Sequence, residues 1–278
     1  MNKSKFSYSN LIYVILLILV LVWTLLPVYW TITAAFKSRL EVIAWPPTFF
    51  PQKPTLNWFV SVWTDRPNIN YYINSIVASI GSTIIALALG IPSAYGCARY
   101  TFRGRQDVLF TILTFRFLPP ATVIVPLYLI GRMFHLIDTT LYLAILYGAI
   151  NVPIVTWVLL SYFKEIPVEL EESYQLDGYT LFGAFRKVTL PLARPGIVAV
   201  SMLIMAFSFG DFLIASILTT SPAAKTLPVG ISEYMGGEWG YMWNQMAALT
   251  IYGLIPLLII FFLVRKNLVR GLTFGAVK

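Results

Sequence analysis

Charged side chains are scarce in this sequence of 278 residues. Asp, Glu, Lys and Arg together make up 12% of the chain, and hydrophobic residues make up 58%. A soluble domain usually carries about 25% charged residues. The shortage of charge excludes a cytosolic enzyme and a disordered chain, and it indicates an integral membrane protein. Cysteine is almost absent as well, and because Cys97 has no second thiol to pair with, an internally cross-linked secreted scaffold is excluded.

Several motifs of metal and nucleotide chemistry are also missing. His135 is the only histidine, so a zinc site of Cys and His ligands is excluded by ligand count. No Gly-x-x-x-x-Gly-Lys-Ser/Thr phosphate loop occurs. We therefore expect no cofactor in this chain, and any ATP-driven process must use a separate polypeptide.

Long stretches without charge predict the membrane-spanning helices. The windows 6–36, 67–98, 139–163 and 239–264 contain no Asp, Glu, Lys or Arg. A helix needs about 20 apolar residues to cross the hydrocarbon core. Two further apolar stretches each contain one charge, Arg116 or Asp211. The sequence thus predicts an all-α, polytopic membrane helix bundle, one transmembrane domain over 1–278 with six spans near 11–36, 71–97, 108–131, 140–162, 196–220 and 244–264.

Basic residues predict the orientation of these helices. With the N-terminus inside, thirteen Lys and Arg lie in inner segments and six in outer segments. Basic residues are enriched in cytoplasmic loops. We expect both termini to be cytoplasmic, and the net charge of +8 needs no nucleic-acid partner to explain it.

The predicted cytoplasmic loop over 163–195 has an unusual composition. It holds five of the twelve acidic residues of the chain, namely Glu165, Glu169, Glu171, Glu172 and Asp177. Pro167 is a suitable first residue for a helix that ends at Gly178. A second helical segment, over 180–188, has its apolar residues along one face. A polar loop of about thirty residues is too long for a simple connector. We expect it to form two short helices that serve a partner.

The letters of this loop resemble a known family. EESYQLDG (171–178) followed by AFRKVTLPL (184–192) is similar to the coupling loop of bacterial ABC importer permeases, a Glu-Ala-Ala motif with a later Gly and Leu-Pro. Glu172, Gly178 and Leu190-Pro191 match the motif, whereas Ser173 and Tyr174 replace its two alanines. RFLPP (116–120), IVPLY (124–128) and RGLTFGAVK (270–278) resemble the carbohydrate-uptake branch, and in particular the smaller permease subunit of the maltose-transporter type.

The resemblance implies a type I ABC importer permease in a bacterial inner membrane, which is a transport subunit and not an enzyme. Its partners would be a second homologous permease, two ATPase subunits that bind ATP and Mg, and an extracytoplasmic solute-binding protein. The ATPases would contact the coupling loop through Glu171, Glu172, Leu176, Asp177 and Gly178. They would also contact the tail through Gly271, Leu272, Thr273, Gly275 and Lys278. The binding protein would be reached by a loop with Gly236, Gly237, Glu238 and Trp239.

The two charges within spans are candidates for the substrate path. A charge at the bilayer centre costs about 2.5–3.5 kcal/mol on the insertion scale, so Arg116 and Asp211 should face the bundle interior or water. Either residue could contact a sugar. Alternatively, Arg116 could form a structural pair with Asp211 or with backbone carbonyls, or it could extend its guanidinium to the membrane surface. The solute class stays open among oligosaccharides, polyols, sugar acids and glycerol phosphates.

Two other functions fit parts of the sequence. A stand-alone, ion-coupled secondary transporter is the main alternative. Such transporters commonly have ionisable residues within the membrane. This chain has only two, and together with the large acidic loop that number favours half of an ABC transporter. An intramembrane hydrolase is a remote alternative, since Gly230-Ile231-Ser232-Glu233 matches only four letters and His135 is its only available base.

Overall fold

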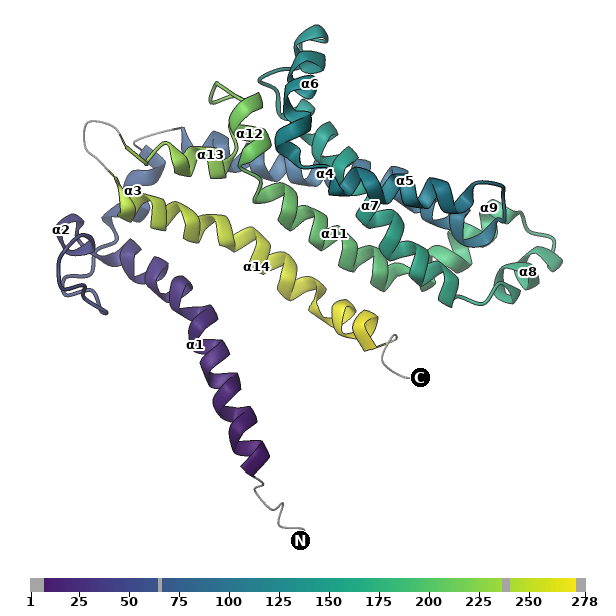
Figure 1. Ribbon diagram of the computed structural model, residues 1–278, viewed down its shortest axis with the longest axis horizontal. Helices are drawn as coiled ribbons and strands as arrows, with labels where there is room; N and C mark the ends of the chain where they lie inside the picture. The colour runs from purple at the N-terminus through teal and green to yellow at the C-terminus, as the bar shows by residue number, and fades with distance from the viewer. Residues whose placement is uncertain (1–7, 65–66, 237–240, 274–278) are drawn as a thin grey trace. The chain divides into compact units, whose positions relative to one another are not determined.

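The computed structural model describes residues 8–64, 67–236 and 241–273, and side chains are described for 11–64, 67–236 and 241–265. Within these residues every regular element is a helix (Figure 1). Four helices are long and apolar enough to cross a membrane, over Leu11–Phe36, Asn68–Arg99, Thr140–Glu165 and Trp243–Arg265. The number rises to six if each of two sharply bent helix pairs is one span. The expected all-α membrane fold is therefore confirmed.

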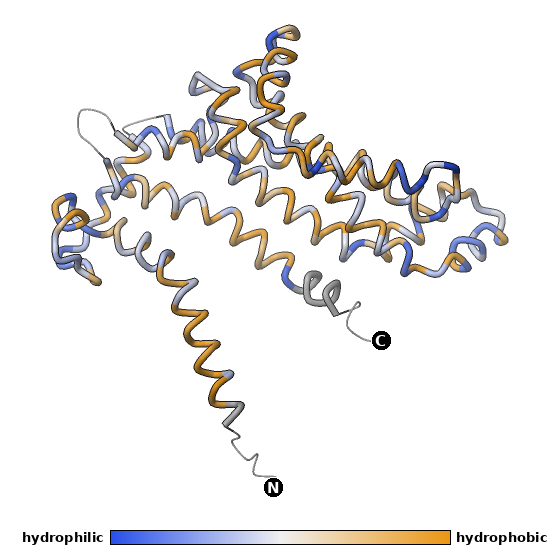
Figure 2. The backbone as a smooth tube through the Cα atoms, viewed as in Figure 1, coloured by the Kyte–Doolittle hydropathy of each residue, from blue (hydrophilic) through white to orange (hydrophobic). Residues whose placement is uncertain are grey.

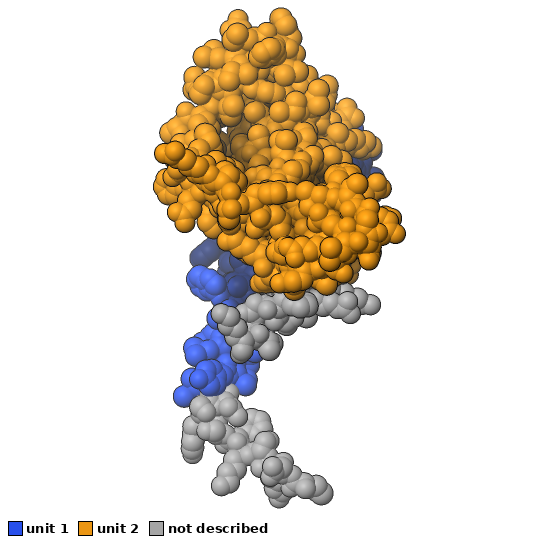
Figure 3. Space-filling view, turned by 90° about the vertical axis from the view of Figure 1, so that its right-hand side faces the viewer, with its two compact units in different colours: residues 1–66, 231–254 blue, residues 67–230, 255–278 orange. Residues whose placement is uncertain are grey.

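The chain divides into two compact units, which are coloured separately in Figure 3. Unit 1 comprises residues 1–66 and 231–254, and unit 2 comprises residues 67–230 and 255–278. Figure 2 shows that apolar residues run along α1 (Tyr8–Phe36), whereas hydrophilic residues gather around α8 (Glu169–Leu176). Each unit has its own internal contacts.

Unit 1 is organised around the end of α1. It contains α1, α2 (Arg39–Val42), α3 (Asn57–Thr64) and the first part of α14 (Trp243–Thr273). The carbonyl of Lys37 accepts hydrogen bonds from Trp58 Nε1 and Asn244 Nδ2, each at 2.8 Å. The Lys37 side chain is buried, donates to the carbonyl of Thr48 and lies 4.5 Å from the centre of the Trp30 ring. Lys37, which directly follows α1, thus connects this helix to α3 and α14.

Unit 2 is built on the close pairing of α4 (Asn68–Arg99) and α7 (Thr140–Glu165), which run side by side in Figure 1. Small residues allow this approach. A Cβ added at Gly81 would lie 2.9 Å from the Cβ of Ala144, and one added at Gly90 would lie 2.5 Å from the Cβ of Val155. Small residues at helix interfaces are a common feature of membrane bundles because they let backbones pack closely.

The predicted span over 108–131 is bent instead of straight. It consists of α5 (Arg105–Phe117) and α6 (Pro120–Met133), which meet at 94°. Leu118 has an extended backbone because a residue before proline avoids the helical region, and Pro120 then starts a new helix. The Pro119-Pro120 pair is the physical cause of the bend.

The predicted span over 196–220 is likewise interrupted. Helix α11 (Arg194–Phe209) ends at the C-cap Gly210, and the short helix α12 (Leu213–Leu218) starts three residues later. Asp211 lies in this break, which gives the carboxylate a structural task described below. Helix α13 (Leu227–Ser232) follows along the chain.

Three short elements connect α8 to α11. They are α9 (Leu181–Ala184), the π-helical turn η1 (Phe185–Thr189) and α10 (Leu190–Leu192). The helix expected over 180–188 is therefore present but continues to residue 192 with a π-turn inside it. It meets α11 at a bend of 71°.

Candidate functional site

Helix α8 presents two different faces. Its first turn contains three acidic residues, which suit the positive end of the helix dipole. The neighbours Glu171 and Glu172 lie about 100° apart around the helix, since one turn takes 3.6 residues. Glu171 is buried, and Glu172 and Leu176 are exposed. The acidic pair is thus divided between the interior and the surface.

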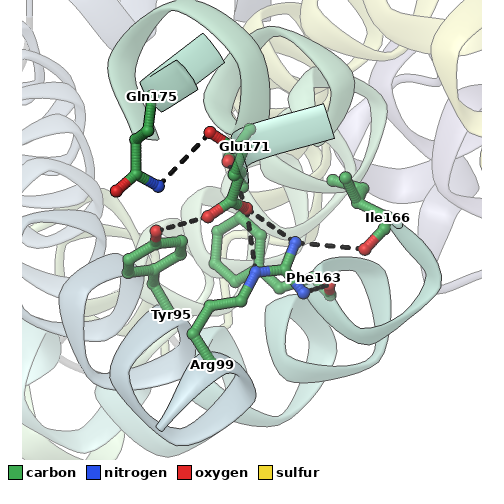
Figure 4. A network of polar contacts seen from close by, with 7 residues as sticks. Tyr95, Arg99, Phe163, Ile166, Glu171 and Gln175 are labelled. Atoms are coloured by element: carbon green, nitrogen blue, oxygen red, sulfur yellow. Dashed lines mark hydrogen bonds and ion pairs between the residues drawn. The ribbon is translucent and has the colours of Figure 1, made fainter. Parts of the chain in front are cut away.

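The buried carboxylate of Glu171 is the centre of a polar network (Figure 4). Its Oε1 atom lies 2.7 Å from Arg99 Nη2 and 2.8 Å from Arg99 Nε. The Tyr95 hydroxyl donates to Oε2 at 2.7 Å, and the Thr189 hydroxyl donates to Oε1 at 2.6 Å. The side chains of Arg99 and Glu171 are 7% and 4% exposed, so this ion pair is almost fully removed from solvent.

Arg99 joins this carboxylate to the end of α7. It is the last residue of α4, and it donates from Nη1 to the Phe163 carbonyl at 2.8 Å and from Nη2 to the Ile166 carbonyl at 3.1 Å. The final carbonyls of a helix have no partner within the helix. A cation placed there satisfies them and also complements the helix dipole. Arg99 therefore caps α7 and pairs with α8 at the same time.

The network keeps Glu171 ionised. Burial alone favours the neutral acid, but the hydrogen bonds from its three side-chain donors outweigh burial and hold the pKa of the Glu171 carboxyl below its ordinary value. The pair is consequently a true ion pair at neutral pH.

The π-turn η1 places Thr189 in the network. The backbone N–H of Leu190 donates to the carbonyl of Phe185, five residues earlier, because the following Pro191 has no N–H and its ring would collide with a carbonyl in a regular helix. Thr189 is the last residue of this widened turn and is fully buried. The Leu190-Pro191 pair of the motif thus produces the turn that directs the Thr189 hydroxyl toward Glu171.

Gly178 forms the turn after α8. The helix ends at Leu176 with Asp177 as its C-cap, and Gly178 has a φ of +89°. Its N–H donates to the Gln175 carbonyl at 3.0 Å, as in a left-handed helix cap. Tyr174, which replaces a motif alanine, stacks on Tyr179 across this turn with ring centres 4.4 Å apart.

An exposed apolar surface lies beside the turn. Leu176 is 89% exposed, and Tyr179 and Phe182 are also exposed. Together with the exposed Glu172 they form what we call the outer face of α8 and its turn. An apolar group of this kind next to acidic residues is typical of a protein interaction site.

Arg116 lines a separate cavity within unit 2. The cavity has a volume of about 780 Å³, and most of its lining is apolar, including Phe115, Leu118 and Ile150. The Arg116 guanidinium lies 5.5 Å from the centre of the Phe207 ring. The cavity therefore offers a single cation among hydrophobic walls.

Asp211 does not pair with Arg116, although the sequence allowed it. No ion pair joins these two described residues. The Asp211 Oδ1 atom accepts from the Tyr147 hydroxyl at 2.9 Å and from the backbone N–H groups of Ile214 at 3.0 Å and Ala215 at 3.3 Å. A side-chain oxygen in this position caps the start of a helix, here α12. The structure thus gives Asp211 a structural role, and its second carboxylate oxygen remains for the predicted substrate contact.

The remaining predicted residues are only partly described. Gly236 has a φ of +85°, and its neighbours Gly237, Glu238 and Trp239 lie outside the described residues. Gly271, Leu272 and Thr273 belong to the last turns of α14, whose side chains are not described there, and Gly275 and Lys278 lie outside the described residues.

Sequence reasoning missed three members of the network. Arg99 is one of the thirteen basic residues that predict the orientation, and the sequence predicts no further role for it or for Tyr95 and Thr189. Arg99 and Glu171 are 72 positions apart, so no local spacing connects them. The local signal is that Glu171 and Glu172 are adjacent in a helix, so that their side chains point about 100° apart.

Comparisons with known proteins agree with this picture. The profile of the family described as "Binding-protein-dependent transport system inner membrane component" matches residues 86–274. The sulfoquinovosyl glycerol transport system permease protein SmoH of Agrobacterium fabrum is 32% identical over 94% of this chain and 91% of its own length. The trehalose transport system permease protein SugB of Mycobacterium tuberculosis is 33% identical over 94% of each chain.

A solved structure gives the same result for the fold. A chain of a bacterial ABC transporter involved in the import of the acidic polysaccharide alginate matches with a TM-score of 0.78 and 20% identity, over 96% of this chain and all of that one. This similarity confirms the expected type I permease fold.

Proposed function

We propose that this chain is the permease subunit of an ATP-driven importer of a sugar or sugar-like solute. The premise is that the chain belongs to the family of binding-protein-dependent transport system inner membrane components. The named relatives carry sulfoquinovosyl glycerol and trehalose, which supports a carbohydrate-type cargo. The cargo class includes oligosaccharides, polyols, sugar acids and glycerol phosphates.

The observation that carries this proposal is the division of α8 into a buried and an outer face. A helix of eight residues is too short to be stable alone, so its order comes from the packing of the Glu171 side. The outer face keeps Glu172 and the 89% exposed Leu176 free for a partner. An ATPase subunit with an apolar cleft and a nearby basic residue fits these two groups.

The other partners follow from the same assignment. A second homologous permease would complete the translocation path, two ATPase subunits would bind ATP and Mg, and an extracytoplasmic binding protein would deliver the solute. Both termini and α8 would lie on the cytoplasmic side of a bacterial inner membrane. The tail residues, among them Gly271 and Lys278, would lie near the ATPase pair, and Gly236 would belong to the loop that faces the binding protein.

The cavity at Arg116 is our candidate for this chain's part of the substrate path. A cation in a largely apolar cavity of about 780 Å³ can donate several hydrogen bonds to hydroxyl or acidic groups of a sugar. Transport would proceed by alternating access, in which ATP-driven closure of the ATPase pair moves α8 and switches the helix bundle between two states. Asp211 would contribute at most its second carboxylate oxygen.

Charge reversal on the outer face of α8 tests the proposal. The chain is co-expressed with its neighbouring permease and ATPase genes, and the complex is purified and reconstituted with the binding protein. Glu172→Arg should abolish the ATPase activity that the binding protein stimulates, because like charges then meet at the docking site. Membrane insertion should be unchanged.

Asp107→Arg is the matched control, since it reverses an exposed acid in the first turn of α5. Its stimulated ATPase activity should stay close to that of the unmodified complex. The proposal is wrong if no ATPase subunit co-purifies with the unmodified chain, or if Glu172→Arg transports and stimulates normally. Accumulation of solute by the isolated chain on an ion gradient would also exclude it and would favour a secondary transporter.

A further inference from the structure

The buried network around Glu171 connects more elements than a local helix anchor requires. Arg99 ends α4, its guanidinium holds two carbonyls at the end of α7, and Glu171 belongs to α8. Thr189 adds the turn that leads into α11. The helices α4, α7 and α11 are therefore connected to Glu171 of α8, either directly or through Arg99 and Thr189.

The chemistry of the network makes it resistant to partial opening. Arg99 and Glu171 are almost completely desolvated, and each would be a buried, unpaired charge if the other moved away. Separating such a pair is far more costly than bending an exposed salt bridge. The planar guanidinium also fixes direction, because it donates to one carboxylate and two carbonyls at the same time.

From this arrangement we infer that Arg99 and Glu171 are positioning residues that fasten α8 to the ends of α4, α7 and α11, so that these parts move as one body during the transport cycle. This inference depends on the proposed function, in which α8 is the element that the ATPase displaces. Neither residue touches ATP or solute. Their contribution is to pass a displacement of α8 to the spanning helices without loss.

The inference predicts a specific defect. In the reconstituted transporter, Glu171→Gln should still bind the ATPase subunits through the intact outer face, but the number of solute molecules carried per ATP should fall about tenfold or more, since breaking a buried pair shifts an equilibrium by at least that factor. Arg99→Lys keeps the charge but replaces the planar guanidinium by a compact ammonium group without its fixed donor geometry, so it should give a smaller loss in the same direction.

Thr189 offers a milder and better controlled variant. Thr189→Val removes the hydroxyl at nearly constant volume and should lower the solute carried per ATP, whereas Thr189→Ser keeps the hydroxyl and should restore it. Tyr142→Phe is the control for loss of a tyrosine hydroxyl elsewhere in unit 2, where the bond to the Leu127 carbonyl has no link to α8. A purely structural role would lower the yield of the Thr189 variants without changing solute per ATP.

A measurement without disruptive variants covers the case in which Glu171→Gln does not fold. Spin labels at the exposed residues Ser173 and Tyr100 report the distance between α8 and the end of α4, in a background where Cys97 is replaced by Ser. The distance should be the same in the nucleotide-free and ATP-bound transporter.

The outcomes separate the inference from the proposed function. A changed distance between the labels, or normal solute per ATP in both Glu171→Gln and Arg99→Lys, overturns the inference while the ATPase partnership stands. Failure of the unmodified chain to bind any ATPase subunit instead overturns the proposed function.

Discussion

The turn at Gly178 gives a prediction whose magnitude follows from one backbone angle. Gly178 has a φ of +89°, and a Cβ added there would meet no atom within 4 Å. Substitution by alanine therefore causes no collision, and its cost is the left-handed conformation alone, roughly 1–2 kcal/mol. That cost lowers the population of the native turn by about 5- to 30-fold. Asparagine tolerates this conformation and should cost less than alanine.

Proline at position 178 should be the most harmful of the three. It fixes φ near −65° and also removes the N–H that donates to the Gln175 carbonyl at 3.0 Å. Gly178→Pro should therefore abolish the ATPase activity stimulated by the binding protein while the chain still inserts into the membrane. The expected order of activity is Gly178→Asn, then Gly178→Ala, then Gly178→Pro.

Gly96→Ala is the control for this series. Position 96 lies inside α4, also has no atom within 4 Å of an added Cβ, and has no positive φ. Alanine there should be neutral or stabilise by roughly 0.5–1 kcal/mol. Thermal unfolding in detergent and stimulated ATPase activity are measured for all four variants. Equal behaviour of Gly178→Ala, Gly178→Asn and Gly96→Ala would refute the argument that the left-handed turn is required.

Three further predictions concern packing, pH and a second loop of unit 2. Gly81→Ala should destabilise the folded chain by about 1–3 kcal/mol, because its Cβ would lie 2.9 Å from that of Ala144. Adding Ala144→Gly should restore most of the lost stability, as measured by thermal unfolding. If it restores none, this contact is not the cause. The lowered pKa of Glu171 means that its contribution to stability is complete above its ordinary pKa near 4.5 and is lost as the pH falls through the lower folded value. The melting temperatures of the unmodified chain and Glu171→Gln should therefore differ by a constant amount at neutral pH and converge in acid, and a gap that widens in acid would contradict this sign. Asp138 has a φ of +61°, and its side chain accepts hydrogen bonds from two backbone N–H groups at 2.8 and 3.0 Å. Asp138→Ala should therefore cost about 1–3 kcal/mol of stability in the same unfolding measurement, and Asp138→Asn clearly less. Equal losses would argue against a role of the left-handed backbone and of the side-chain acceptor.

The helices of this protein could be predicted because their signal is local. A window without charge is enough to indicate a helix that crosses a membrane, and all four charge-free windows contain such a helix. The bend at Pro119-Pro120 was also accessible in principle, since the rule for residues before proline needs no tertiary structure. The length of the apolar stretch does not reveal the bend, because α5 and α6 together have the length of one span.

Asp211 shows how a local signal can leave a structural role unrecognised, here the capping of α12. An acidic residue inside an apolar stretch suggests a substrate contact when the stretch is assumed to be one helix. Gly210 ends that helix, and the carboxylate then caps the next one. The pair of a helix-ending glycine and a helix-capping aspartate is itself a sequence signal, and it would have predicted the interruption.

The Arg99–Glu171 pair could not be predicted, because the two side chains meet only after α4 and α7 have packed together. An arginine near the end of a span looks like an orientation signal whatever its partner, and 72 positions separate it from the carboxylate. The tertiary structure therefore adds an ion pair that relates the acidic loop to the spanning helices.

Two adjacent acids on a short helix meet two demands that one residue could not meet. A helix of eight residues needs tertiary contacts to keep its shape, yet a docking helix must leave polar and apolar groups available to its partner. Because adjacent helical positions diverge by about 100°, Glu171 can be directed into the protein while Glu172 stays at the surface. A buried ion pair adds little net stability compared with an apolar contact of similar volume, but it enforces one arrangement by penalising every other. That preference for a single geometry, more than stability, is what a helix that transmits movement requires.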